Sequence, residues 1–180
     1  MQTTLKQSTF LETQRLILRP FNENDFDAIL PIYTDNNVMQ FVNHGARTSA
    51  EVAAELQKYI KHWERHGFGA CAVIEKASGK LIGRADLYIS DRSPYPQLGY
   101  VLDQPFWGKG YATEAAKTYL NYGFNSLKFN RIVAFARTFN FASLHVLEKL
   151  GMQRKRELEY ANRQYLEYAI SRAEYLAKAS

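Results

Sequence analysis

The glycine-containing stretch at residues 107–115 limits what this chain can fold into more than any other feature. It reads Trp-Gly-Lys-Gly-Tyr-Ala-Thr-Glu-Ala, after an apolar run at residues 97–102 and before a helical pattern. Alternate glycines allow a backbone to approach a ligand closely, and the N-terminus of the following helix offers free N–H groups and a positive dipole end. With the cation Lys109, this arrangement suits a pyrophosphate. A helix start that needs glycines for steric reasons explains the same residues, since the stretch is neither a P-loop nor G-x-G-x-x-G.

Hydrophobic periodicity along the chain predicts an α+β fold. Asn22 is a predicted cap for the helix at 26–33, and Thr48 is a predicted cap for the helix at 49–66. Residues 93–96 are predicted to form a loop. The order β-α-α-β-β-β-α-β-α-β-β, a meander followed by crossover helices, indicates a mixed, mostly antiparallel central sheet with flanking helices. In chain order the predicted elements are a strand at 15–19, helices at 26–33 and 49–66, strands at 70–74, 81–89 and 97–102, a helix at 111–127, a strand at 131–137, a helix at 140–150, and strands at 153–160 and 164–170.

Length and composition exclude several classes of protein. The 180 residues fit a single domain over residues 1–180, and the net charge of +5 is spread along the chain without a nucleic-acid signature. No apolar run approaches the roughly 20 residues of a membrane span. Residues 1–10 lack a signal peptide, and Cys71, the single cysteine, excludes an internal disulfide. We therefore expect a cytoplasmic protein that binds neither nucleic acid nor membranes, with Cys71 as a buried, inert thiol.

Tracts in a fixed order along nearly the whole chain carry a family pattern. They are residues 11–20, Lys-Leu-Ile-Gly at 80–83, Leu-Gly-Tyr-Val-Leu-Asp at 98–103, residues 106–116, Asn-Phe-Ala-Ser at 140–143 and Val-Leu-Glu-Lys-Leu-Gly-Met at 146–152. They resemble the GNAT acetyltransferase superfamily, and most of all its ribosomal-protein N-acetyltransferase (Rim-type) branch. The resemblance implies the GNAT, or acyl-CoA N-acyltransferase, fold and an enzyme that uses acetyl-CoA and no metal.

The resemblance also implies roles for individual residues. The strand at 97–102 would pair with the pantetheine arm and splay from the strand at 131–137, which opens a wedge where thioester and amine meet. Ser143 would help to protonate the leaving thiolate, and Lys149, together with Arg154, would neutralise the 3′-phosphate. The cofactor-binding residues implied in this way are Tyr100, Val101, Leu102, Trp107, Gly108, Lys109, Gly110, Tyr111, Ala112, Thr113, Asn140, Ser143 and Lys149.

Three positions depart from the family pattern. Pro105 replaces a residue that would offer an N–H, and Leu147 replaces a tyrosine that many members use as the acid. Gln97 stands where the Rim-type branch has glutamate, and an amide cannot act as a general base. Gln97 remains a catalytic candidate because its amide can hold a water. Without the carboxylate, we expect α-amino or other acceptors of low pKa to be preferred over lysine side chains.

Other polar residues have simpler interpretations. His62 and His66 have the i, i+4 spacing of metal ligands, but surface histidines are the favoured reading. Asp86, Glu75 and Asp91 could reach the wedge, yet a solvated strand face explains each of them. Tyr88 and Trp107 are expected to pack, and His145 to face solvent.

The resemblance implies an N-acetyltransferase that transfers the acetyl group of acetyl-CoA to a primary amine. The acceptor is expected to be an α-amino group of a peptide or protein N-terminus, or a small amine; an amino acid, a polyamine and a drug stay open. A catalytically weakened CoA-binding sensor or interaction module of the same fold is the alternative that Gln97 and Leu147 favour. Both a monomer and a homodimer are compatible with the sequence.

Overall fold

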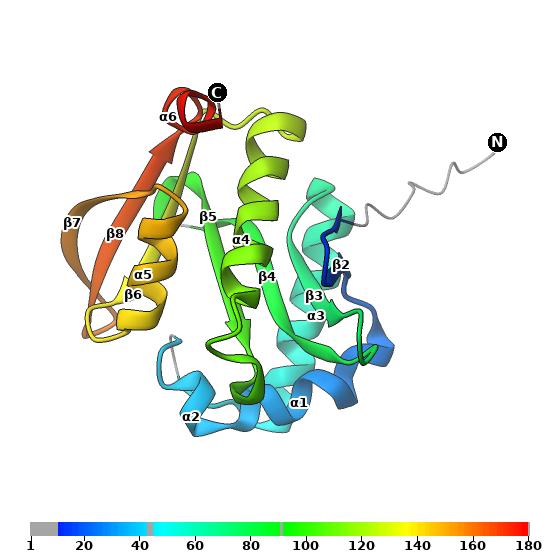
Figure 1. Ribbon diagram of the computed structural model, residues 1–180. Coiled ribbons are helices and arrows are strands. Elements are labelled where there is room, and N and C mark those ends of the chain that lie inside the picture. Colours follow the sequence, from blue (N-terminus) through cyan, green and yellow to red (C-terminus); the bar gives the residue numbers. More distant parts are fainter. Residues whose placement is uncertain (1–10, 43–44, 91, 180) are drawn as a thin grey trace.

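A single mixed sheet forms the centre of the protein (Figure 1). The structure is a computed structural model that describes residues 11–42, 45–90 and 92–179. Its eight strands lie in the order β1-β2-β3-β4-β5-β6-β8-β7. All neighbouring pairs are antiparallel except β5 with β6, which is parallel. The strands are β1 (Leu11–Glu12), β2 (Leu16–Pro20), β3 (Ala70–Glu75), β4 (Leu81–Ser90), β5 (Ser93–Leu102), β6 (Arg131–Arg137), β7 (Gln153–Tyr160) and β8 (Arg163–Ser171). The predicted mixed, mostly antiparallel sheet is confirmed.

Helices cover both faces of the sheet and create two cores. On one face, α4 and α5 pack over side chains such as Leu87 and Leu98; on the other, α1, α2 and α3 pack over Ala70 and Ala72. Cys71 and Val73 of β3 belong to the first core, so neighbouring residues of this strand point to opposite cores, as strand geometry requires. The helices are α1 (Phe26–Thr34), α2 (Asn36–Met39), α3 (Ser49–His66), α4 (Tyr111–Asn121), α5 (Phe141–Lys149) and α6 (Arg172–Ala179). None of the helices in the described ranges is long and apolar enough to cross a membrane.

The predicted helix caps are present. The side chain of Thr48 accepts from the Glu51 amide and the Glu51 carboxylate accepts in return, which is the capping box expected from the sequence. Asn22 caps a short 3₁₀ helix, Glu23–Asp25, which leads directly into α1. These side chains satisfy amides that would otherwise lack acceptors at the helix start.

The sheet opens between β5 and β6. Among the described residues, the register between these two strands holds one pair, Gln97 with Val133. From Leu98 onward, β5 keeps its pairing with β4 and has no partner strand on its other side. The opening lies between the two strands that were predicted to splay apart, at residues 97–102 and 131–137.

Several predicted boundaries are wrong. Residues 93–96, expected as a loop, belong to β5; Pro94 and Pro96 are tolerated there because the β6 side of this stretch is unpaired. The helix expected to reach residue 127 ends at Asn121 and continues as a π-helical turn, Tyr122–Ser126. The prediction also missed β1, α2 and α6, which are short or terminal and carry too few residues for a periodic signal.

Candidate functional site

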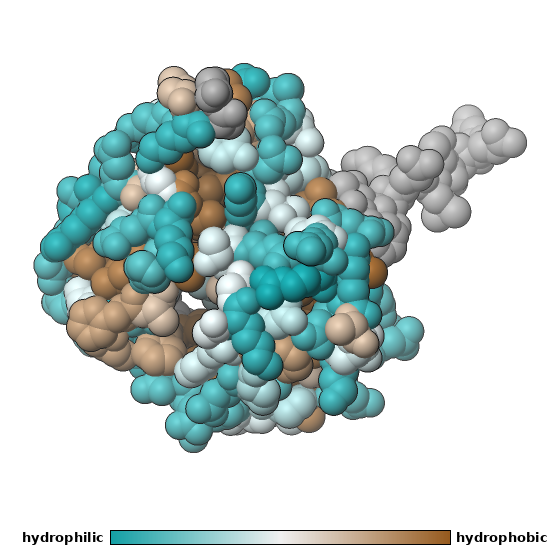
Figure 2. Space-filling model, viewed as in Figure 1, coloured by the Kyte–Doolittle hydropathy of each residue, from teal (hydrophilic) through white to brown (hydrophobic). Residues whose placement is uncertain are grey.

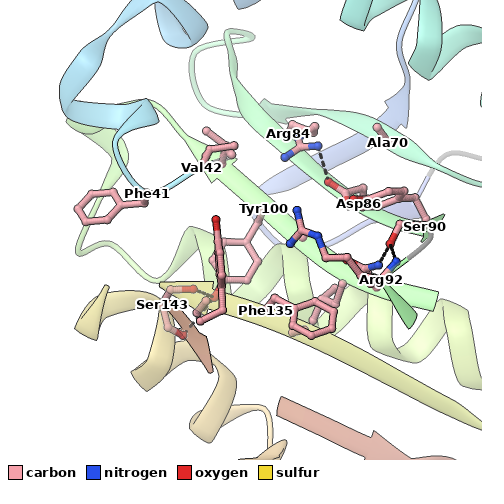
Figure 3. A pocket seen from close by; sticks show the side chains of 18 of the residues that line it. Phe41, Val42, Ala70, Arg84, Asp86, Ser90, Arg92, Tyr100, Phe135 and Ser143 are labelled. Carbon is pink, nitrogen blue, oxygen red and sulfur yellow. Dashed lines mark hydrogen bonds and ion pairs between the residues drawn. The ribbon is translucent and has the colours of Figure 1, made fainter. Parts of the chain in front are cut away.

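A cavity of about 530 Å³ occupies the opening between β5 and β6. The molecular surface is hollowed on this side between α5 and the loop before α4, and exposed hydrophobic side chains gather below α5 (Figure 2). Residues from α3, β4, β5, β6 and α5 line the cavity, and Figure 3 shows 18 of the lining side chains. The volume lies in the range of small-molecule sites, roughly 300–1,000 Å³.

The loop before α4 presents unengaged amides. Gly108 and Gly110 have φ of +71° and +81°, a left-handed conformation that favours glycine. Within the described ranges, no amide of residues 108–113 donates a hydrogen bond to the protein, because the helix starts at Tyr111 and its first amides lack intrahelical acceptors. A row of free N–H groups at a helix N-terminus is a binding site for phosphate.

Arg15 holds this loop in place from the first strands. Its guanidinium donates to the Lys109 carbonyl oxygen at 2.9 Å and forms an ion pair with Glu114 at 2.6 Å, and it stacks on the Tyr111 ring at 4.3 Å. Glu114 also accepts from the Thr13 hydroxyl and the Arg15 amide. Sequence reasoning missed Arg15 as a positioning residue, because 94 residues separate it from the loop that it contacts.

A shallow hollow beside the loop gathers two further cations. It is lined by Gly110, Thr113, Lys117 and Lys149, among others. Lys149, a predicted phosphate contact, thus lies close to the loop, and Lys117 is an additional cation that the sequence did not single out. Arg154 lies on β7 and pairs with Glu157 at 3.4 Å, and it does not line this hollow.

Tyr100 and Ser143 lie side by side in the lining of the cavity. The Tyr100 hydroxyl lies 2.8 Å from the Ser143 hydroxyl and donates to the Ser143 carbonyl oxygen at 3.2 Å. Asn140 caps α5 by accepting from the Ser143 amide at 3.2 Å, which fixes Ser143 at the helix start. Burial raises the pKa of the Tyr100 phenol, so the phenol keeps its proton at neutral pH.

Gln97 lies at the vertex of the opening. Its side chain is buried, and its amide nitrogen donates to the Ser90 hydroxyl. The Trp107 indole donates to the Leu102 carbonyl oxygen at 2.7 Å, so this predicted cofactor contact is already engaged within the protein. The stretch of β5 with a free edge is therefore residues 98–101.

Asp86 is buried in the cavity wall, so its interpretation as part of a solvated strand face is wrong. The residue is 1% exposed and forms an ion pair with Arg84 at 3.0 Å (Figure 3). It pairs with Gly99 on β5, where an added Cβ would lie 2.6 Å from the carboxylate oxygen Oδ1. Burial raises the pKa of Asp86, and the attraction of Arg84 offsets only part of this effect.

Of the two remaining carboxylate candidates, Glu75 does not line the cavity. Glu75 accepts from the hydroxyls of Ser78 and Tyr111 near the loop before α4, and these hydrogen bonds lower its pKa. Asp91 lies outside the described residues.

The two histidines of α3 differ in their surroundings. His62 is half-buried and lines the cavity, whereas His66 is exposed. Burial lowers the pKa of the His62 imidazole, and the neighbouring His66 adds to the shift. Across the described part of the chain, no three His, Cys, Asp or Glu side chains are grouped to hold a metal ion. Cys71 is buried, and burial raises the pKa of its thiol to about 12.

Comparison with known proteins decides the family. Residues 15–153 match the model of the acetyltransferase (GNAT) domain. The chain belongs to the GNAT acetyltransferase family. It is similar to the uncharacterized N-acetyltransferase YnaD of Bacillus subtilis, with 32% identity over 145 residues that cover 81% of this chain and 83% of that protein. A GNAT acetyltransferase from Bacillus anthracis has a similar crystal structure, with a TM-score of 0.80, 27% identity and coverage of 92% and 99% of the two chains.

Family membership makes this protein an N-acetyltransferase, and GNAT acetyltransferases use acetyl-CoA as cosubstrate. The ribosomal-protein-S5-alanine acetyltransferase of Vibrio fischeri shares the fold, with a TM-score of 0.75 at 20% identity over 93% of this chain and 98% of that one. This likeness concerns the fold alone. Membership of the Rim-type branch stays a prediction.

Within this GNAT fold, most of the residues predicted for the site fall into two groups. The loop residues and Lys149 lie around the N-terminus of α4, while Gln97, Tyr100, Asn140 and Ser143 line the cavity. The residues that sequence reasoning missed, Arg15 and Arg92 above all, contact the site from distant segments or from the turn between β4 and β5.

Proposed function

We propose that this protein transfers the acetyl group of acetyl-CoA to the α-amino group or another primary amine of a small acceptor. The observation that carries the proposal is the cavity at the opening of the sheet. It joins a buried carboxylate, Asp86, to a hydrogen-bonded pair of hydroxyls, Tyr100 and Ser143. A base on one side and a proton donor on the other are what acyl transfer to an amine requires.

The chain's own groups fit acetyl-CoA, which supplies the activated thioester when bound. Free amides of residues 108–113, with Lys109, Lys117 and Lys149 nearby, are suited to the pyrophosphate and the 3′-phosphate. The unpaired edge of β5 at residues 98–101 is suited to pairing with the amides of the pantetheine arm. Arg15 and Glu114 keep the loop and the helix start in a fixed orientation.

Asp86 is the proposed general base. The chemistry requires an amine that has lost its proton before it attacks the thioester carbonyl carbon. Asp86 accepts this proton, directly or through one water, and its raised pKa makes it a stronger base than an exposed aspartate. Gln97, which cannot accept a proton, orients the polar groups at the vertex through Ser90.

Tyr100 and Ser143 form the proposed proton donor. When the C–S bond breaks, the leaving thiolate needs a proton. The two hydroxyls are 2.8 Å apart, so a proton can pass between them and on to the sulfur. Leu147, which occupies the place of the tyrosine expected from the family pattern, is 1% exposed and packs in the core.

Release of free CoA thiol tests the proposed function. Purified protein with acetyl-CoA and a panel of peptides, amino acids, polyamines and drug-like amines should release thiol with at least one acceptor, and mass spectrometry should find that acceptor acetylated. Thiol release that no amine in the panel stimulates would contradict the proposal and favour a CoA-binding module without transfer activity.

Removing the two hydroxyls should show that they act as one unit. We expect Ser143→Ala and Tyr100→Phe each to lower kcat by about 10²-fold with little change in the KM of acetyl-CoA, because a general acid contributes about 10²–10⁴. The double variant should be no worse than the weaker single variant, since the members of a relay are not additive.

Tyr168→Phe is the matched control for this series. Tyr168 lies on β8 outside the cavity, and its hydroxyl donates to Glu148 on α5, the helix that also carries Ser143. The kcat of this variant should stay close to wild type. Multiplicative losses in the Ser143 and Tyr100 double variant would show that the two hydroxyls act separately.

A further inference from the structure

The cavity holds a guanidinium that the proposed chemistry does not use. Arg92, in the turn between β4 and β5, extends its side chain into the cavity (Figure 3). Its guanidinium carbon lies 4.0 Å from the ring centre of Tyr160, 5.5 Å from that of Tyr165 and 5.8 Å from that of Phe135. In the part of the chain that the structure describes, this guanidinium forms no ion pair with a carboxylate.

The aromatic rings orient the guanidinium without consuming its hydrogen-bond donors. A guanidinium stacks on rings through its faces, whereas its five N–H groups point outward in the plane. The cation–π contacts with the three rings hold the guanidinium in place without using its N–H groups, which can therefore bind a carboxylate in bidentate geometry.

The charges of the other cavity residues agree with an anionic ligand group. Among the described lining residues, four side chains are cationic (Arg47, Lys58, Arg84 and Arg92) and two are carboxylates (Glu55 and Asp86). The two carboxylates are already matched: Asp86 pairs with Arg84, and Glu55 pairs with Arg47 at 3.0 Å. A polyamine would bring further positive charge next to unmatched cations, which is unfavourable.

Arg92 and the proposed base lie on the same side of the opening. Asp86 pairs with Ala70 of the neighbouring strand, and Ala70 belongs to the core under α1 and α3, so Asp86 lies on this face of the sheet. Phe135, which contacts Arg92, follows Ala134 on β6. Because Ala134 belongs to the core on the opposite face, Phe135 lies on the same face as Asp86. Tyr88, between them on β4, responds to both charges: burial and Asp86 raise the pKa of its phenol, while Arg92 lowers it. Both groups line the same cavity, so an acceptor bound there faces both of them.

We infer that the acceptor carries a carboxylate that binds Arg92 while its amine meets Asp86, so that the substrate class is a free amino acid or a similar amino carboxylate. This inference rests on the proposed function and narrows it. Acetyl transfer forms an N-acetyl amino acid: the amine nitrogen bonds to the acetyl carbon, the C–S bond breaks, and the released proton balances the thiol.

Matched acceptors test the inference. The kcat/KM of wild type and Arg92→Gln is measured for L-amino acids and for their carboxamides, which lack the negative charge. Carboxamides have the more acidic amine, so the ratio of the two kcat/KM values is compared between variants. We expect the kcat/KM for the amino acid, divided by that for its carboxamide, to fall about 10- to 100-fold in Arg92→Gln, because a charge-assisted contact is lost. The same ratio should fall less in Arg92→Lys.

Arg131→Gln is the matched control. Arg131 also stacks on a tyrosine, at 5.4 Å from the Tyr95 ring centre, but it does not line the cavity. Its ratio should equal that of wild type. Peptides that begin with Asp or Asn form a second arm: a preference for Asp that depends on Arg92, without activity on free amino acids, would overturn the assignment to amino acids.

The outcomes separate the inference from the proposed function. Thiol release with an unchanged ratio in Arg92→Gln overturns the inference and leaves N-acetylation standing. Absence of thiol release with every amine contradicts the proposed function itself. If Arg92→Gln does not fold, thermal unfolding of wild type with CoA decides: stabilisation by an L-amino acid but not by its carboxamide supports the inference, and equal shifts overturn it.

Discussion

Asp86→Asn is expected to lower kcat/KM at pH 7 by about 10²- to 10⁴-fold, the contribution of a general base. The asparagine has the same shape but cannot accept a proton from the acceptor amine. In wild type, the rate should rise with pH as the Asp86 carboxyl loses its proton. Because burial raises the pKa of Asp86, this rise should lie above the range of an ordinary aspartate, about 3.9. This part of the rise should be absent in Asp86→Asn, whereas the rise at higher pH from deprotonation of the acceptor amine remains.

A double variant separates catalysis from stability. Asp86→Asn leaves the buried guanidinium of Arg84 without its ion-pair partner, which costs about 3–5 kcal/mol of stability. Arg84→Gln combined with Asp86→Asn removes both charges and should recover part of the melting temperature. If Asp86 is the base, the double variant stays inactive although it is more stable. Recovery of activity together with stability would show that the pair is only structural.

Gly110→Val is expected to weaken CoA binding about 100-fold. Gly110 has a φ of +81°, which a β-branched side chain adopts only with strain, so the backbone has to move. The amides of residues 108–113 then no longer point in one direction, and loss of one or two charge-assisted hydrogen bonds at 1.5–3 kcal/mol each accounts for this factor. Calorimetric titration with CoA measures the effect.

Gly79→Val controls for the strain itself. Gly79 has a φ of +69° in the turn between β3 and β4, and an added Cβ there would meet no atom within 4 Å. We expect a similar loss of stability in both variants but wild-type affinity in Gly79→Val. A folded Gly110→Val protein that binds CoA normally would remove the loop from the site.

Local sequence patterns determined most of the elements and the loop before α4. Caps, turn residues and apolar spacing act over a few residues, so Thr48 at the start of α3 and the two glycines before α4 were readable without the fold. The family pattern, spread over nearly the whole chain, added the place of the opening between β5 and β6.

Tertiary structure decided which polar residues belong to the site. Asp86 alternates with apolar residues on β4, a pattern that also describes a solvated strand face; it is buried because helices cover both faces of the sheet. Two helices are predicted before the strand meander and two after it, and this arrangement indicated that helices pack on both faces of the sheet. Burial then sets the protonation behaviour of Asp86, which no local pattern encodes.

Contacts between distant segments lie beyond the sequence by itself. Arg15 reaches the loop before α4, and the aromatic rings around Arg92 come from β6, β7 and β8. Spacing along the chain predicts neighbours on one strand or helix, because these have fixed periods. Which faces meet depends on strand order and on how far β5 and β6 diverge, and the packing of the whole sheet determines both.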